Sequence, residues 1–385
     1  MSIFGKFVMM KKIVIASDSF KGSLSSAQIA ETLGSAFQTL EPGCITLGVQ
    51  VADGGEGTVA AVASIKPVKW AEVTVSDPLG RSIRTSYALD EDGCALLEMS
   101  AASGLPLLKP EERNPEKTST FGTGEMILDA LDRGCRKFVV GIGGSATNDA
   151  GTGMLQALGA RFLNAQGEEL KACGAALSQI RSIDLSNLDS RLSGCSFSVA
   201  CDVDNPFCGP QGAAFVFAPQ KGADSQMVKS LDRGLENFAQ VIESHLGIDI
   251  RDIPGAGAAG GLGGAFTAFL KASLKPGVDV VLDSIGFDAL IQGADLVITG
   301  EGKMDSQTAS GKTPLGVLRR ASARGIPVIA VAGCVQHCPE LDNLGFNEIY
   351  ATAEPGVPLE KAVTEEYTCA RLRQIAAQIL QKYQA

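Results

Sequence analysis

The stretch FVVGIGGSATNDAGTG, at residues 138–153, limits what this chain can fold into more than any other segment. Residues 137–140 predict a short buried strand, and a helix is expected from about residue 153 to 158. The glycines of this stretch let backbone amides approach an anion closely, and the following helix adds a favourable dipole. A tight turn that needs positive φ angles is an equal alternative for this stretch alone. The candidate phosphate-binding residues here are Gly141, Gly143, Gly144, Ser145, Thr147 and Asn148.

Comparable polar loops follow other apolar segments, which are predicted to form strands at residues 12–16, 46–51, 197–201 and 295–299. Ligands of α/β proteins bind at the carboxyl ends of such strands. In the first of these loops, Asp18, Ser19 and Lys21 place a carboxylate, a hydroxyl and an ammonium within four residues. This combination suits a kinase, because it can orient a hydroxyl or a metal ion and neutralise a phosphate. A solvated loop that caps the following helix is the alternative.

Carboxylates also follow the second and third of these strands. Asp53 and Glu56 lie in a glycine turn, where capping of the next helix explains them equally well. Asp202, Asp204 and Asn205 lie directly at a strand end. Oxygen ligands of this kind suit Mg²⁺, which commonly needs only one or two protein carboxylates beside nucleotide phosphates. An Asx-turn before the next proline is the alternative for this second group.

Two further segments carry candidate ligand groups. The loop after the strand at 295–299 is crowded with charged and polar side chains, namely Glu301, Lys303, Asp305, Gln307, Thr308 and Lys312. The run PGAGAAGGLGG, at residues 254–264, contains Gly257 and Gly260. Its small residues can let a backbone wall lie against a nucleotide. A flexible hinge is the other explanation for this run.

The order of the predicted elements indicates two domains, which a length of 385 residues allows. Strand–helix alternation at both ends of the chain predicts one parallel sheet built from residues 1–76 and 294–385. Residues 77–293 are expected to form an inserted α/β domain with glycine-rich loops. Within it, residues 82–89 and 94–99 predict an antiparallel pair around a short turn.

Composition argues against several classes of function. The net charge of -10 and the lack of a basic patch argue against nucleic-acid binding. No apolar run approaches the length of a membrane span, and the N-terminal stretch MSIFGKFVMMKK is too short and irregular for a signal peptide. The ten cysteines are scattered, many of them in apolar segments, which is typical of reduced thiols in a cytoplasmic protein. Cys334, His337 and Cys338 form the one suggestive metal cluster, and they lack a second pair at zinc spacing.

The motifs, in their order, resemble those of the bacterial glycerate kinase family, the glycerate 2-kinases of glucarate, galactarate and glyoxylate breakdown. The matching segments cover nearly the whole chain and are KIVIASDSFKGSLS, VADGGEGT, RNPEKTSTFGTGE, GIGGSATNDAGTGM, ACDVDNPFCGPQGA, FAPQKGAD, PGAGAAGGLGG, LKPGVDVVLD and DLVITGEGKMDSQTASGKTPLGV. Each segment is weak alone, whereas the ordered series is specific. The first loop departs from the family's usual APDSFKES, because Ser17 replaces the proline and Gly22 the glutamate.

The resemblance implies an α/β fold of two domains, in which a discontinuous flavodoxin- or Rossmann-like parallel-sheet domain carries a mixed α/β domain as an insertion. It implies ATP and Mg²⁺ as reactants, D-glycerate as acceptor and 2-phosphoglycerate as product. The expected enzyme is cytoplasmic and binds neither nucleic acid nor membranes. Phosphorylation of carbon 3, another small hydroxy acid as acceptor, and the oligomeric state stay open.

Roles for the loop residues follow from this implied activity. Phosphoryl transfer asks mainly for positioning and charge neutralisation, and both histidines lie outside every motif, so a carboxylate is the natural base. Lys21 is expected on the transferred phosphate or the substrate carboxylate, with Asp18 or Asp202 as base or metal ligand. Glu301 is expected at the metal or the substrate. The glycine loop, with Gly257 and Gly260, is expected to bind ATP. The expected substrate-binding residues are Ser19, Asp53, Glu56, Asp305 and Gln307.

Two other classes of function fit the sequence less well. Some relatives of the family are sugar-acid responsive DNA-binding regulators, but this acidic sequence contains no helix-turn-helix segment. A dinucleotide-dependent oxidoreductase needs a G-x-G-x-x-G motif after the first strand, and the sequence has none there.

Overall fold

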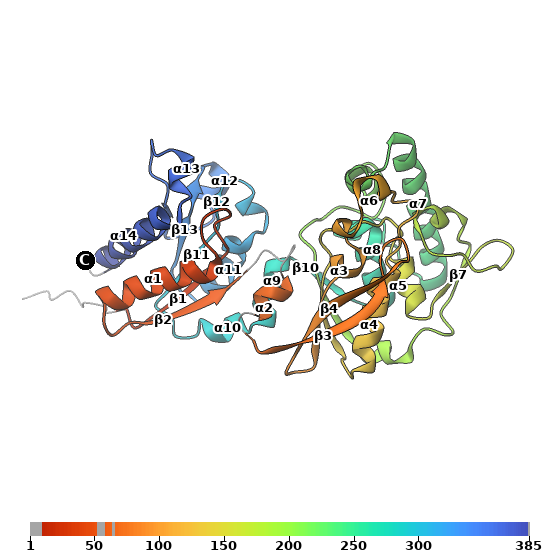
Figure 1. The fold of residues 1–385 in the computed structure, drawn as a ribbon, viewed down its shortest axis with the longest axis horizontal. Helices are drawn as coiled ribbons and strands as arrows, with labels where there is room; N and C mark the ends of the chain where they lie inside the picture. The colour runs from red at the N-terminus through yellow and green to blue at the C-terminus, as the bar shows by residue number, and fades with distance from the viewer. Residues whose placement is uncertain (1–9, 52–57, 64–65, 384–385) are drawn as a thin grey trace, which may run out of the picture. The chain divides into compact units, whose positions relative to one another are not determined.

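The structure of the chain is a computed structural model that describes residues 10–51, 58–63 and 66–383. Contacts between residues divide the chain into two compact units. The parallel-sheet unit comprises Met1–Asp53 and Val281–Ala385, and the inserted unit comprises Gly54–Val280. In Figure 1 the red elements of the N-terminal segment, up to residue 50, and the blue elements of the C-terminal segment belong to the same unit. The parallel-sheet unit is therefore discontinuous in the sequence.

The parallel-sheet unit is built on a five-stranded sheet in the order β15-β13-β11-β1-β2. Its strands are β1 (Lys12–Ser17), β2 (Ile45–Gln50), β11 (Leu296–Gly300), β13 (Val328–Ala332) and β15 (Glu348–Ala351). Each of these strands pairs with its neighbours in parallel. Numbered along the chain within this unit, the strand order is 2-1-3-4-5, the flavodoxin-like order with its switch point between the first and third strands. The predicted parallel sheet from both chain ends is confirmed.

Helices cover this sheet because its central strands β1, β11 and β13 are buried along almost their whole length. The first, α1 (Ser26–Leu40), begins with a capping box in which the Ser25 side chain and Gln28 bond to each other's backbone N–H groups. Its buried face packs with β1 and with α14 (Glu365–Tyr383). That face carries Ile29, Leu33 and Phe37 at helical spacing.

The pattern of residues 358–383 predicts one C-terminal helix, but the structure divides this segment. Two helices, α13 (Leu359–Ala362) and α14, are separated at Val363 and Thr364. The Thr364 hydroxyl donates to the Lys361 carbonyl at 2.8 Å, while the Thr364 carbonyl accepts from the Thr368 N–H at 3.0 Å. Thr364 therefore ends one helix and opens the next, a local use of a hydroxyl that helical periodicity does not reveal.

Short elements complete the parallel-sheet unit. They are α9 (Gly277–Ser284), which crosses the boundary between the units, α10 (Phe287–Leu290), α11 (Thr313–Ser322), α12 (Pro339–Asp342), the 3₁₀ turn η6 (Thr308–Ser310), and the paired strands β12 (Lys303–Met304) and β14 (Cys334–Val335). The predicted helix at residues 314–323 corresponds to α11.

The inserted unit is built on a six-stranded mixed sheet in the order β10-β9-β6-β5-β4-β3. Its strands are β3 (Val68–Ser76), β4 (Ser82–Asp90), β5 (Cys94–Glu98), β6 (Lys137–Gly141), β9 (Ser196–Ala200) and β10 (Ser273–Lys275). The first three form an antiparallel meander, and β5, β6, β9 and β10 are parallel. The predicted antiparallel pair of β4 with β5 is confirmed. Phe138 and Phe197 lie opposite each other on β6 and β9, and their rings stack with centroids 4.6 Å apart.

The remaining elements of the inserted unit pack around this sheet. Its helices are α2 (Thr58–Ala63), α3 (Ser100–Ser103), α4 (Phe121–Asp132), α5 (Thr152–Ala157), α6 (Ala213–Phe217), α7 (Ser225–Leu246) and α8 (Ala258–Leu270). A small hairpin is formed by β7 (Arg161–Leu163) and β8 (Ser182–Asp184). The 3₁₀ turns are η1 (Leu105–Leu107), η2 (Pro110–Glu112), η3 (Gly174–Gln179), η4 (Ser190–Gly194) and η5 (Pro219–Lys221). Within the residues described, no helix is both long enough and apolar enough to cross a membrane.

The units divide the chain earlier than the ranges 1–76, 77–293 and 294–385 expected from the sequence. Strand β3 was expected in the domain of the chain ends, yet it pairs with β4 along its whole length and belongs to the mixed sheet. At the second junction, α10 already belongs to the parallel-sheet unit. A strand's own residues predict its extended conformation but not which sheet supplies its partner. The domain boundaries therefore could not be predicted from the local sequence.

Gly300, the last residue of β11, provides a test of the strand spacing. A Cβ atom at this position would lie 1.8 Å from the carbonyl oxygen of Val331 on β13. We expect Gly300→Ala to lower the free energy of unfolding by about 3 kcal/mol, because the backbone cannot yield without opening the sheet. The measurement is urea unfolding. Gly43→Ala is the control, since a Cβ there meets no atom within 4 Å, and equal stability of the two variants would contradict the expectation.

Candidate active site

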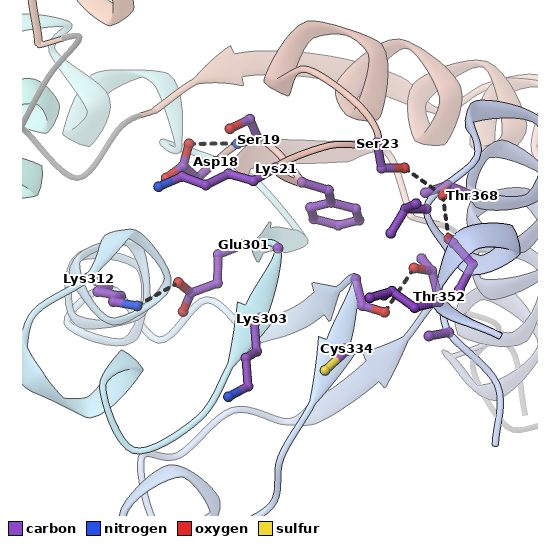
Figure 2. Close-up of a pocket in the computed structure, with 17 residues that line it drawn as sticks. Asp18, Ser19, Lys21, Ser23, Glu301, Lys303, Lys312, Cys334, Thr352 and Thr368 are labelled. Atoms are coloured by element: carbon purple, nitrogen blue, oxygen red, sulfur yellow. Dashed lines mark hydrogen bonds and ion pairs between the residues drawn. The ribbon is translucent and has the colours of Figure 1, made fainter. Parts of the chain in front are cut away.

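A pocket of about 380 Å³ opens at the carboxyl ends of four strands of the parallel-sheet unit. Asp18 directly follows β1, Glu301 follows β11, Thr352 follows β15, and Cys334 comes two residues after β13. Figure 2 shows these side chains around one space. The first two flank the switch point of the flavodoxin-like sheet, which is where α/β proteins of this order bind their ligands. The sequence predicted that Asp18 and Glu301 each follow the end of a strand, but not that the two line one pocket.

One end of this pocket gathers charged groups. Three ammonium side chains, those of Lys21, Lys303 and Lys312, line it together with the carboxylates of Asp18 and Glu301. The Lys312 Nζ atom lies 3.5 Å from Glu301 Oε2. Cations outnumber carboxylates among the lining residues, although the chain as a whole carries a net charge of -10. This end is therefore locally suited to an anionic ligand.

The two carboxylates are held in different ways. Asp18 stays close to its own backbone, because the Ser19 N–H donates to Asp18 Oδ1 at 2.6 Å. Glu301 is 8% exposed and accepts a hydrogen bond from the Thr308 hydroxyl at 2.6 Å. Burial raises the pKa of Glu301 above its ordinary value, while the Thr308 hydroxyl and the Lys312 ammonium act in the opposite direction. A partly desolvated carboxylate of this kind is more basic than one in water.

The other end of the pocket is apolar and comes from residues that the sequence reasoning did not single out. Phe20 is 3% exposed, and Leu359, Ala362 and Val363 line the pocket from α13 and its C-terminal end. The hydroxyls of Ser23 and Thr368 lie 2.7 Å apart beside them (Figure 2). Phe20 and Ser23 come from the loop after β1, whereas Leu359, Ala362, Val363 and Thr368 come from the C-terminal helices and the residues between them, where no motif marks them.

A second pocket, of about 310 Å³, lies within the inserted unit at the carboxyl ends of β6 and β9. Gly143, Gly144 and Ser145 line it from the glycine loop, and Asp202 lines it from the loop after β9. Gly144 adopts a φ of 70°, so the tight-turn explanation holds at this position. Asp202 Oδ1 accepts from the Gly277 N–H at 2.7 Å.

The other residues predicted to bind ATP lie within the protein around this second pocket. Thr147 and Asn148 are fully buried, and among the residues described the Asn148 amide has no hydrogen-bond partner. Gly141 lies inside β6. A Cβ on Gly257 would lie 2.1 Å from the Pro206 carbonyl, and one on Gly260 would lie 2.1 Å from the Thr147 carbonyl. The glycine run thus packs against backbone of its own unit, while Ala258 and Ala259 line the pocket.

Asp149, the carboxylate of the glycine loop, connects this loop to Thr120 and to the start of α5. Its Oδ2 atom accepts from the Thr120 N–H at 2.7 Å, the Thr120 hydroxyl at 2.8 Å and the Gly153 N–H at 3.2 Å. Its Oδ1 atom accepts from the Gly151 N–H at 3.2 Å. Complete burial raises the pKa of Asp149, and these hydrogen bonds act against that rise.

Two other predicted substrate-binding residues, Asp305 and Gln307, line neither pocket. Asp305 pairs with Lys303 at 2.9 Å and accepts from the Gln307 N–H, so both belong to the loop before η6. Lys303 and the loop backbone hold the pKa of Asp305 below its ordinary value. Asp53 and Glu56 lie outside the described residues. Of the predicted site residues, four line the pocket of the parallel-sheet unit, namely Asp18, Ser19, Lys21 and Glu301, and four line the pocket of the inserted unit, namely Gly143, Gly144, Ser145 and Asp202.

Sequence reasoning did not assign a role to Lys221, although it lies in the motif FAPQKGAD. Its side chain is 1% exposed, and its Nζ atom donates to Ser145 Oγ and to the Thr147 carbonyl, both at 2.7 Å. Burial lowers the pKa of Lys221 to about 7. The signal that could have found it is its place in a mostly apolar run, FVFAPQKGA, where a charged side chain is costly to bury.

A flavodoxin-like sheet with cations and carboxylates at its switch point, together with a mixed unit that has a glycine-loop pocket, defines a two-unit α/β protein with pockets suited to small anionic ligands. The model of the glycerate kinase family matches residues 13–384, and the chain belongs to this family. The chain is 47% identical to a glycerate kinase of Bacillus subtilis (strain 168), over 96% of this chain and 97% of that protein. It is 43% identical to the glycerate 2-kinase of Escherichia coli (strain K12), over 95% of this chain and 97% of that protein.

A solved structure agrees with this membership. The crystal structure of a protein assigned as glycerate kinase 2 from Salmonella typhimurium LT2 matches with a TM-score of 0.85 and 42% sequence identity. The match covers 97% of this chain and 98% of that chain. The expected membership and the expected fold class are thus confirmed.

The buried carboxylate of Glu301 predicts a pH-dependent stability. Because its folded pKa is raised, burial of the charge costs nothing below the unfolded pKa and its cost grows as the pH rises through the folded pKa. We expect Glu301→Gln, which keeps an acceptor for Thr308, to raise the unfolding temperature at pH 8 and to leave it unchanged at pH 4.

The matched variant Asp305→Asn should show the opposite sign. The pKa of Asp305 is lowered by Lys303, so its charge stabilises the fold above the unfolded pKa and its removal lowers the unfolding temperature at pH 8. Differential scanning fluorimetry over this pH range measures both variants. A lower unfolding temperature for Glu301→Gln at pH 8 would contradict this expectation. It would show that the ion pair of Glu301 with Lys312 stabilises the fold by more than burial of the charge costs.

Proposed function

We propose that this protein is an ATP-dependent D-glycerate kinase that transfers the γ-phosphoryl group to the 2-hydroxyl and releases 2-phosphoglycerate and ADP. The observation that carries the proposal is the charged end of the pocket at the β1–β11 switch point, where Lys21 and Lys312 meet Asp18 and Glu301. The name of the Escherichia coli relative, a glycerate 2-kinase, supports the choice of carbon 2.

The chemistry of the acceptor fits this end of the pocket. Glycerate brings a carboxylate and an attacking hydroxyl, and the transition state spreads negative charge over the phosphoryl oxygens. Lys21 neutralises the transferred phosphoryl group or the substrate carboxylate, and Asp18 accepts the hydroxyl proton or holds the metal ion. Ser19 donates its hydroxyl to the substrate. Glu301, whose pKa is raised by burial, is a second group able to take up a proton.

The second pocket suits the phosphates of the co-substrate. Gly143, Gly144 and Ser145 offer backbone and hydroxyl donors, and Asp202 offers carboxylate oxygen. Mg²⁺ enters with ATP as part of that substrate and neutralises phosphate charge. It keeps most of its ligands from water and phosphate, so single carboxylates such as Asp202 and Glu301 match what it takes from a protein. Asp53, Glu56, Asp305 and Gln307 are retained as further substrate-binding candidates.

The compartment proposed for this enzyme is the cytoplasm. All ten cysteines of the chain lie in the described part, and each is a free thiol. Proteins that rely on free thiols suit a reducing compartment, where ATP is also available.

A coupled assay tests the reaction and its position on the acceptor. Purified protein is incubated with Mg-ATP and D-glycerate, and 2-phosphoglycerate is detected through enolase with and without added phosphoglycerate mutase. We expect signal without the mutase. Signal only with the mutase would move phosphorylation to carbon 3, and no signal from folded protein would reject D-glycerate in favour of another hydroxy acid.

Lys21 provides a test of the charged end of the pocket. We expect Lys21→Ala to lower kcat by about two to three orders of magnitude, because an ammonium that stabilises transition-state charge is lost. The exposed Lys11 of the same unit supplies the control, and Lys11→Ala should keep normal turnover. Steady-state kinetics compares the kcat of the two variants, and circular dichroism establishes that both are folded. Near-normal turnover of Lys21→Ala would remove this residue from the reaction.

A further inference from the structure

Lys221 has no part in the function proposed above, yet the local backbone fixes its position closely. It ends the 3₁₀ turn η5, and the next residue, Gly222, has a φ of 98°. A Cβ on Gly222 would lie 2.4 Å from the Arg113 carbonyl, so the turn is held tightly against the rest of the inserted unit. This turn directs the lysine side chain inward, to the underside of the glycine loop, where its Nζ atom reaches Ser145 and Thr147.

The cost of this arrangement makes a purely structural role a poor explanation. Both acceptors of the Lys221 ammonium are neutral oxygen atoms, and no ion pair of Lys221 is found among the described residues. Asp149 is the carboxylate that acts on it electrostatically, but hydrogen bonds from Thr120, Gly151 and Gly153 already engage both Asp149 oxygens. Burial of an ammonium without a paired carboxylate is unfavourable, and an apolar side chain of similar length would fill the space at lower cost.

The hydroxyl of Ser145 connects this buried charge to the second pocket. Ser145 is 9% exposed and lines that pocket, whereas Lys221 does not reach it. A serine hydroxyl has one proton to donate and two lone pairs to accept. Because the Lys221 ammonium donates to this oxygen, the Ser145 proton is left to point elsewhere, and the open direction is the pocket. In its protonated form the Lys221 side chain therefore both orients the hydroxyl as a donor and adds positive charge behind it.

The geometry points to Lys221 as a positioning residue that orients Ser145 to donate a hydrogen bond to a phosphate group of the nucleotide on the loop Gly143–Gly144–Ser145. This inference rests on the proposed use of the second pocket for nucleotide phosphates. Lys221 acts from beneath the loop and touches no ligand itself. Its loss should weaken nucleotide binding and leave the acceptor's affinity nearly unchanged.

The test compares Lys221→Met with Lys229→Met in the full chain. Met has nearly the length of Lys without its charge, and Lys229 is an exposed lysine of α7. Isothermal titration with Mg-ADP, without acceptor, gives Kd, and steady-state kinetics gives both KM values. We expect Lys221→Met to raise the Kd of Mg-ADP and the KM of ATP about tenfold or more, as for loss of a charge-assisted hydrogen bond. The KM for D-glycerate should change less than twofold, and Lys229→Met should behave as the unmodified protein.

A double-mutant cycle separates positioning from packing. Ser145→Ala should weaken Mg-ADP binding by a similar factor, and the double variant should bind no more weakly than either single variant, because one hydrogen bond is lost in all three. Additive losses would overturn the inference. Thermal unfolding supplies a second criterion, since removal of the buried charge should not lower the unfolding temperature. A fall in unfolding temperature that accounts for the weaker binding would assign Lys221 to packing.

The outcomes for the unmodified protein distinguish this inference from the proposed function. Unmodified protein that binds Mg-ADP but does not phosphorylate D-glycerate overturns the proposed acceptor and leaves the Lys221 test valid. Unmodified protein that binds neither Mg-ADP nor Mg-ATP overturns both. If Lys221→Met does not fold, Ser145→Ala decides alone, and unchanged Mg-ADP affinity in a folded Ser145→Ala protein overturns the inference.

Discussion

The parallel pairing of β1 with β11 is the interaction on which the site of the parallel-sheet unit depends. Ile13 lies opposite Leu296 and Ser17 opposite Gly300, so the two strands end at the same level. The Asp18 N–H then donates to the Gly300 carbonyl at 2.9 Å and carries the ladder one step further. Asp18 and Glu301 thus leave fixed backbone positions on neighbouring strands, and a shift in register would separate them.

The two pockets collect positive charge in different ways within an acidic chain. In the parallel-sheet unit the ammonium groups line the pocket directly. One of them, that of Lys312, lies 3.5 Å from the Glu301 carboxylate, which offsets part of its charge. In the inserted unit the charge of Lys221 lies under the loop, and a serine hydroxyl stands between it and the pocket. The first arrangement is screened by water and salt, whereas the second is protected from both by burial.

The sequence predicted what depends on local pattern. Apolar segments predicted most strands of the two sheets, and strand–helix alternation predicted the parallel sheet from both chain ends. The flavodoxin- or Rossmann-like character of that unit was implied by the family resemblance. The sequence did not predict that β3 pairs with β4, since partner choice is a long-range property. The apolar end of the first pocket was missed because Leu359 carries no chemical signature. Lys221 was missed because a lysine is normally a surface residue, and only the three-dimensional packing shows otherwise.

The discontinuity of the parallel-sheet unit also governs how the chain can acquire its structure during synthesis. When Val280 has left the ribosome, the inserted unit has all its strands, but β1 still lacks its neighbour β11. One edge of the apolar strand β1 therefore stays unpaired until β11, at Leu296–Gly300, has been synthesised. Domains that are continuous in sequence fold as they emerge, so the inserted unit is complete first. The long closure between β1 and β11 is the slow step that topology imposes on this fold.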